Sequence, residues 1–163
     1  MLFRWSRRRR RRDDKTVVLE ALSQSRRALI AVRRGIALLE NSPNPPRDML
    51  KSLYVMESVI EAVIVRLETI LVVGGAAGSL VVEPLKLVKE ASRRLTGLPP
   101  ELYGYLQEVE AQLNSIADVY DVEAISARLQ GRDLPGSRIE EILEEAERAA
   151  EEKVSRRRES SPL

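Results

Sequence analysis

Two long stretches of the sequence carry apolar residues at alternating spacings of four and three, and no other feature constrains the fold as strongly. This spacing places the apolar residues along one face of an α-helix, so each stretch is expected to be a helix that packs through this seam. The first seam consists of Val18, Leu22, Ser25, Leu29, Val32, Ile36 and Leu39, and the second of Met49, Leu53, Met56, Ile60, Val63, Leu67 and Ile70.

A short proline-rich segment separates the two stretches. Residues 41–46 read Asn-Ser-Pro-Asn-Pro-Pro, and a helix cannot continue through three prolines in four residues. Because the connection is short, the second helix is expected to fold back antiparallel to the first. With Asp13-Asp14 as the N-terminal cap, we predict a helical hairpin over residues 13–73, whose helices are about 26 residues and about 40 Å long.

The second helix carries more apolar residues than a hairpin seam can cover. The additional residues are Leu50, Tyr54, Val55, Val59, Ile64 and Leu71. They widen the apolar stripe, so either another helix or another copy of the protein is expected to pack against it.

A glycine-rich segment follows the hairpin. Gly74, Gly75 and Gly78 weaken any helix that passes through them, which predicts a hinge between two arrangements of the chain; a plain loop is the alternative. Beyond it the sequence predicts amphipathic helices over 79–96 and 100–129, a linker over 131–136, an acidic helix over 137–154 and a disordered tail over 155–163. An aromatic content of only 4% also favours an all-α fold in this 163-residue chain.

The composition excludes several classes of chemistry. The chain has no Cys and no His, which rules out disulfides, Cys/His zinc sites, Cys nucleophiles and His acid–base catalysis. The glycine segment is followed by no Lys-Ser/Thr, so it does not form a phosphate-binding loop. Glu57 and Glu61 are four residues apart and are interpreted as an acidic strip on one helix face. We therefore expect neither an enzyme nor a cofactor or metal site.

The N-terminal arm, residues 1–12, carries a dense positive charge. Within it an apolar cluster adjoins a run of six arginines: Leu2, Phe3, Arg4, Trp5, Arg7, Arg8, Arg9, Arg10, Arg11 and Arg12. This combination suits an anionic membrane surface, with the arginines on lipid headgroups and the apolar residues at the headgroup boundary. No apolar run is long enough to span a bilayer and no signal-peptide pattern follows, so contact with the surface is expected.

Charge is distributed asymmetrically along the sequence. Residues 1–34 carry twelve Lys and Arg against three acids, a net charge of +9, and since the whole chain carries +2 the remainder carries −7. An anionic partner is expected at the basic end, with self-association or a basic partner at the other. Alternatives to the membrane are a nucleic-acid-associated helical protein that uses the same arm, a coiled-coil scaffold or adaptor, and a merely solubilising tail.

The segment from Tyr54 through the third helix to Glu101 resembles the archaeal ESCRT-III-like cell-division proteins, the CdvB group. The most specific piece is Arg66-Leu67-Glu68-Thr69 within an apolar helix, followed by a glycine at position 74. The order of elements over residues 13–130 is also similar to that family: a basic N-terminus, a long hairpin, a shorter helix, a proline-containing break, an amphipathic helix and an acidic C-terminal region.

This resemblance implies a filament subunit that lies on the cytoplasmic face of the cell membrane at the division site. It implies a switch between a closed monomer and an open polymer, co-assembly with ESCRT-III-like paralogues, and a AAA ATPase that grips the C-terminal region. Leu134-Pro135 keeps only part of the family's ATPase-binding motif, and the helix over 137–154 lacks regularly spaced leucines. The chain also ends before a winged-helix extension, as a shorter paralogue would.

Overall fold

The computed structural model describes residues 2–73, 78–119 and 136–160, with side chains over 15–73, 80–119 and 138–157. This part of the chain is helical with short connections and contains no strand, which confirms the all-α class. Its elements are α1 (Leu2–Glu40), α2 (Arg47–Val73), the 3₁₀ helix η2 (Gly78–Val81), α3 (Val82–Arg94), α4 (Pro100–Val119) and α6 (Gly136–Ser160).

Helices α1 and α2 pack antiparallel along the two predicted seams. All residues of the two seams are buried except Leu29, Leu39 and Met49, which are partly buried. The one polar member, Ser25, is completely buried, and its hydroxyl donates to the carbonyl of Ala21 at 2.8 Å. Because that hydrogen bond stays within α1, the seam tolerates the hydroxyl without an unsatisfied donor.

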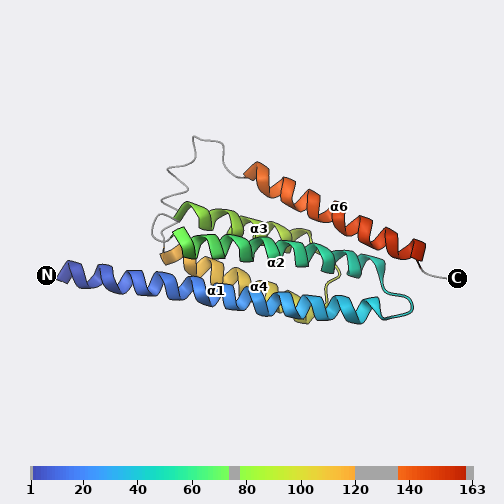
Figure 1. Cartoon of the computed structure of the whole chain (residues 1–163), viewed down its shortest axis with the longest axis horizontal. Helices are drawn as coiled ribbons and strands as arrows, with labels where there is room; N and C mark the ends of the chain where they lie inside the picture. Colours follow the sequence, from blue (N-terminus) through green and yellow to red (C-terminus); the bar gives the residue numbers. More distant parts are fainter. Residues whose placement is uncertain (1, 74–77, 120–135, 161–163) are drawn as a thin grey trace.

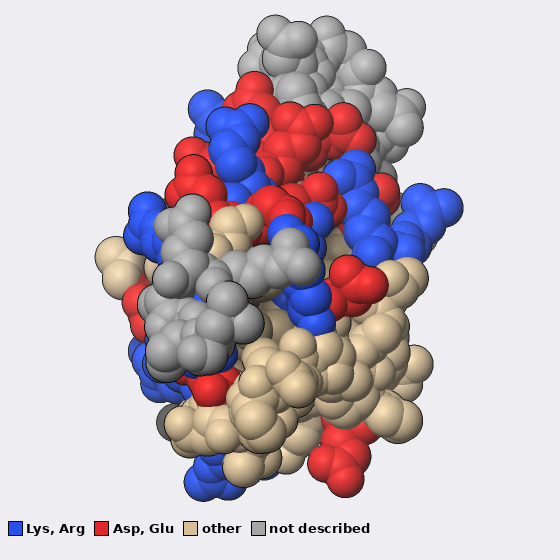
Figure 2. All heavy atoms as spheres, turned by 90° about the vertical axis from the view of Figure 1, so that its right-hand side faces the viewer, with Lys and Arg blue, Asp and Glu red and all other residues tan. Residues whose placement is uncertain are grey.

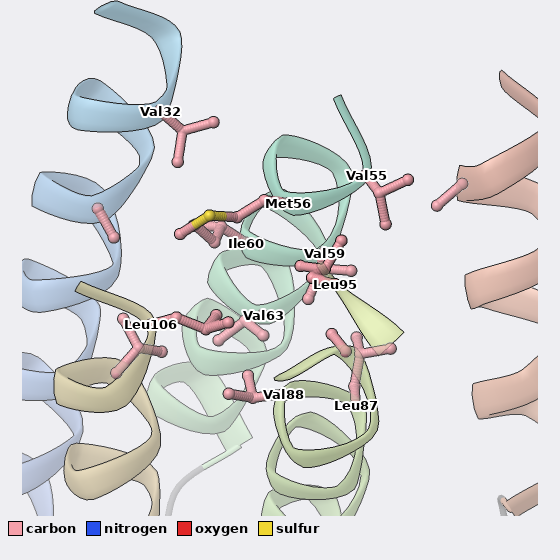
Figure 3. Packing of buried hydrophobic residues seen from close by; sticks show 14 of the residues in the cluster. Val32, Val55, Met56, Val59, Ile60, Val63, Leu87, Val88, Leu95 and Leu106 are labelled. Atoms are coloured by element: carbon pink, nitrogen blue, oxygen red, sulfur yellow. The ribbon is translucent and has the colours of Figure 1, made fainter. Parts of the chain in front are cut away.

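The hairpin is one half of a four-helix bundle. Helix α4 packs on α1, and α3 packs on both α2 and α4, so the four helices enclose one core (Figure 1). Figure 3 shows Val32 of α1, Met56 of α2, Val88 of α3 and Leu106 of α4 directed into this core. The exposed fraction of these side chains is 0–1%. This packing arrangement follows from apolar stripes on every helix.

Helix α6 lies outside the bundle, against α2 and α3. Lys153 of α6 lies over the ring of Tyr54, and Val154 lines one groove together with Leu50. Figure 3 shows Val55 directed toward α6 and Val59 beside Leu95 at the end of α3. The structure thus resolves the alternative left by the sequence: helices of the same chain, α3 and α6, pack against the additional apolar residues of α2.

A sharp turn at Gly97 brings α4 back along α3. Gly97 has φ +79°, a left-handed conformation that other residues adopt only with strain, and no side chain lies within 4 Å of where its Cβ would stand. Two hydroxyls hold the turn: Tyr103 donates to the carbonyl of Leu95 at 2.7 Å and Ser52 donates to that of Thr96 at 2.8 Å. These bonds satisfy carbonyls at the end of α3.

The first helix begins earlier than expected. The sequence placed its start at Asp13, but α1 runs from Leu2 and passes through Asp13 and Asp14 without a break. Arginine is a good helix former and residues 2–14 contain neither Gly nor Pro, so nothing interrupts the helix there. The arm is therefore the first turns of α1 rather than a separate segment.

The later boundaries also differ from the predictions. Helix α3 is shorter than 79–96 because Pro84 is tolerated only in a first turn and Leu95 is already extended at ψ 114°. The disordered tail predicted over 155–163 is wrong up to Ser160, since α6 continues to that residue. Arginines near a helix C-terminus interact favourably with its dipole, and Arg157 contacts Glu40. Residues 120–129 of the predicted fourth helix and the linker up to 135 lie outside the described residues.

Candidate functional site

The predicted membrane-binding residues all belong to the N-terminal turns of α1. Figure 1 shows this part of α1 projecting beyond the ends of α2 and α4. The backbone of Leu2 to Arg12 is helical, and the side chains of this segment lie outside the described residues. Because consecutive helix positions are about 100° apart, six consecutive arginines encircle the axis.

The predicted hinge is described in part. Gly74 and Gly75 lie outside the described residues, while Gly78 is the first residue of η2. On the far side of this segment, η2 packs on α2 and α4. The hinge remains a prediction, whereas the assembly seam predicted for the hairpin is the buried contact between α1 and α2.

The acidic strip on α2 binds the arginines of α1. Arg33 is 3.3 Å from Glu57 and 2.8 Å from Glu61, and Arg26 is 3.3 Å from Glu68. The hydrogen bond that Arg33 donates to Glu61 is the main cause that raises the pKa of Arg33 above its ordinary value. These pairs are largely solvent-exposed, so each adds little stability, but they fix the flank of α1 that faces α2.

The Arg66-Leu67-Glu68-Thr69 motif connects three helices. Arg66 donates through Nε to Glu83 of α3 at 2.8 Å, makes a second short contact through Nη2, and donates to the carbonyl of Ala62. Leu67 is fully buried, and Glu68 reaches α1 through Arg26. Sequence reasoning identified this motif by resemblance alone; in the structure it joins α2 to α3 and to α1.

A polar network fastens the C-terminal half of α6 to the hairpin. Glu151 lies 2.6 Å from Arg47 and 2.9 Å from Lys51. The hydrogen bonds from Lys51 and Arg47 lower the pKa of Glu151. Arg157 contacts both the carboxylate and the carbonyl of Glu40. Figure 2 shows charged side chains of both signs crowded over α6 and a largely uncharged area below them.

The apolar seam of α6 is narrow. Its buried residues are Ile139, Leu143, Ala146, Ala150 and Val154. Sequence reasoning did not identify the two alanines as buried, although their spacing from Leu143 and Val154 was the available signal. Ion pairs lie at the borders of this seam, such as the pair between Arg94 of α3 and Glu140 at 2.9 Å.

Tyr54 makes a contribution to the stability of the fold that is lost at alkaline pH. Burial, together with the hydrogen bond that its hydroxyl donates to Glu40, raises the pKa of Tyr54 to about 12, and Lys153 lies 5.1 Å from the ring centroid. Since the folded pKa exceeds that of the unfolded chain, this stabilisation is complete below about pH 10 and is lost as the pH rises toward 12.

We expect Tyr54→Phe to lower the free energy of unfolding by about 1 kcal/mol at neutral pH. The difference between the variant and the parent chain is expected to shrink between pH 10 and 12, because only the parent has a hydroxyl to ionise. Urea denaturation followed by circular dichroism at several pH values measures this. A difference that stays constant across that range would contradict the assignment.

The described residues offer no built small-molecule or metal site. An open groove of about 500 Å³ between α2, α3 and α6 is lined by side chains of both signs, among them Arg66, Glu83 and Arg138. No group of acidic residues in the described part of the chain is arranged to hold a metal ion. No helix described here is both long and apolar enough to cross a lipid bilayer.

Comparison with protein-family models, with curated proteins and with solved structures finds no match for this chain. The surfaces of the molecule that bear on function are a projecting basic helix, a closed four-helix bundle and an outer helix held by a narrow apolar seam with ion pairs at its borders.

Proposed function

We propose that this chain is a peripheral membrane protein that self-associates into filaments and remodels membranes, in the manner of the ESCRT-III-like proteins it resembles. The observation that carries the proposal is the projection of the arginine-rich first turns of α1 beyond the bundle. A cationic helix free of the bundle is accessible to an anionic bilayer, and its terminal Leu2, Phe3 and Trp5 suit the headgroup boundary.

The expected strength of this contact favours polymers. A basic residue near an anionic leaflet contributes about 1 kcal/mol of binding free energy before screening. Because successive positions of a helix are about 100° apart, only about half of six consecutive arginines can face a flat surface at once. One subunit would then bind weakly, whereas neighbouring subunits in a filament would bind together with much higher apparent affinity. Weak individual contacts of this kind also allow a polymer to be dismantled.

The position of α6 supports a closed resting subunit. It covers α2 and α3 through small apolar residues and exposed ion pairs, which is a contact of modest strength. Detachment of α6 would expose Tyr54 and Val55 on α2, and another copy or an ESCRT-III-like paralogue could cover them. The C-terminal region would then be available to a AAA ATPase, and cell division at the cytoplasmic face of the membrane is the process we propose.

Co-sedimentation with vesicles tests this proposal. We expect the full chain to sediment with phosphatidylserine-containing vesicles, to dissociate as salt is raised, and to bind at least about tenfold more weakly after Leu2, Phe3 and Trp5 are changed to Ala. Leu29→Ala in the hairpin seam is the matched control, because it removes apolar surface away from the arm. Unchanged binding by the triple variant would show that the arm is purely electrostatic, and no sedimentation at all would overturn the membrane function.

A nucleic-acid partner is the second candidate. A continuous basic helix that projects from a helical body can enter the major groove of DNA, and the arginines around its axis could contact phosphates on both sides. Salt-sensitive binding to duplex DNA, equal in strength to vesicle binding and unaffected by the triple variant, would favour this candidate over the membrane.

A further inference from the structure

The outer face of α1 within the bundle carries a second set of exposed basic and apolar side chains. Leu19, Ile30 and Leu38 are 47%, 52% and 75% exposed. Arg27 and Arg34 lie exposed on the same helix and have no ion-pair partner among the described residues. Large apolar side chains left in water between unpaired arginines indicate an interaction surface.

Contacts with the neighbouring helices define where this face points. Arg26 and Arg33 reach α2 on one flank of α1, while Gln24 donates to Glu108 of α4 on the other. The face that carries Arg27, Ile30 and Arg34 lies between these flanks, away from the core. The side chains on this face are therefore exposed because of how the helices pack in the bundle.

The outer face continues directly from the N-terminal arm. Helix α1 has no break between Leu2 and Glu40, so the arm and the outer face share one axis about 58 Å long. If the arm lies along a surface, a straight helix brings the outer face of α1 toward the same surface. Contact by the arm alone would require α1 to bend, or the bundle to stand on the tip of the helix.

The charges on the two sides of the molecule suit an anionic surface at α1. Over residues 15–39 α1 has five Lys and Arg and a single acid, Glu20. Helix α6 lies on the opposite side of the bundle (Figure 1), and its first half carries four exposed acids, Glu140, Glu141, Glu144 and Glu145. An anionic bilayer against α1 thus attracts the near side and repels the far one. A second copy that docked through the same face would oppose like charges.

We propose that the outer face of α1, centred on Arg27, Ile30, Arg34 and Leu38, contacts the headgroups of an anionic bilayer, so that the bundle lies along the membrane with α6 facing away. This inference rests on the membrane association proposed above and adds to it the orientation of the whole subunit. It makes α6 accessible to proteins in solution while the subunit is bound.

Single-cysteine labelling tests the orientation, because the chain contains no Cys. Leu38→Cys and Ala149→Cys, each carrying an environment-sensitive fluorophore, are mixed with phosphatidylcholine vesicles that contain 30% phosphatidylserine and a lipid-borne quencher. We expect quenching of the label at position 38, about 54 Å along α1 from Leu2, and none at position 149 on the exposed side of α6. Equal quenching of both, or of neither, in chains that bind the vesicles would overturn the orientation.

A charge-matched pair of variants tests the energetics. We expect the double variant Arg27→Gln and Arg34→Gln to bind these vesicles about tenfold more weakly, and Arg148→Gln with Arg156→Gln on α6 to change binding by less than about twofold. Equal losses would mean that only net charge matters and that α1 has no preferred face. If neither the parent chain nor any variant binds vesicles, the proposed function itself fails, and this outcome is distinct from binding without orientation.

Discussion

Replacing Leu67 with Ala is expected to lower the free energy of unfolding by about 2–5 kcal/mol. Leu67 belongs to the predicted hairpin seam and is completely buried in α2, where the core of the bundle closes around it. The substitution removes three buried carbon atoms and leaves a cavity, because helices that are packed on several sides relax only in part. Urea denaturation followed by circular dichroism measures the loss as a lower midpoint with an unchanged slope.

Val72→Ala is the matched control for this experiment. Val72 lies on the same helix but is 86% exposed, so we expect a change of less than about 0.5 kcal/mol. Similar losses for the two variants would mean that α2 does not occupy the centre of the folded chain. A changed slope for Leu67→Ala would point instead to loss of the two-state transition.

Leu143→Asp is expected to detach α6 while the four-helix bundle remains folded. Leu143 is 1% exposed and is the largest fully buried side chain of α6, whose other buried residues include two alanines. A carboxylate at this buried position would have to leave water, at a cost of several kcal/mol. The contact of α6 with α2 and α3 is too narrow to offset such a cost, whereas α1 to α4 enclose their own core.

Hydrogen exchange resolved along the chain measures this result. We expect amides over residues 138–157 to lose protection, while those of the α2 core, around Met56 and Val63, keep theirs. Glu144→Gln is the control, because its exposed side chain faces away from the bundle. Loss of protection throughout the chain would show that α6 is an integral part of one cooperative unit.

Filaments formed by Leu143→Asp in electron micrographs would support the closed resting state proposed above.

The hairpin could be predicted because its determinants are local. Val18, Leu22 and Val32 repeat with the period of a helix, and Pro43 to Pro46 end that helix at a definite place. Both signals depend only on residues close together in the chain. The structure accordingly buries all but three residues of the two seams and turns at residues 41–46.

The candidate site was less accessible to sequence reasoning. The arginine run identified a cationic segment, but the sequence placed a boundary at Asp13, where the helix continues. A cap is only a weak preference, of about 1 kcal/mol, and it does not end a helix when good helix formers precede it. The exposed arginines on the outer face of α1 were missed, because the four arginines of this stretch look alike in the sequence. Only the structure shows that Arg26 and Arg33 pair with α2, whereas Arg27 and Arg34 lie on the outer face.

Helical character, the antiparallel pairing of α1 with α2, and the absence of Cys- and His-based chemistry all follow from the sequence, because residue type and spacing along the chain decide them. Tertiary structure alone decides which of the later helices covers the wide stripe of α2. It also decides which arginines of α1 pair with Glu57, Glu61 and Glu68, and which face of α1 remains in water. Those outcomes depend on contacts between residues tens of positions apart, and several helix arrangements could satisfy the same local pattern.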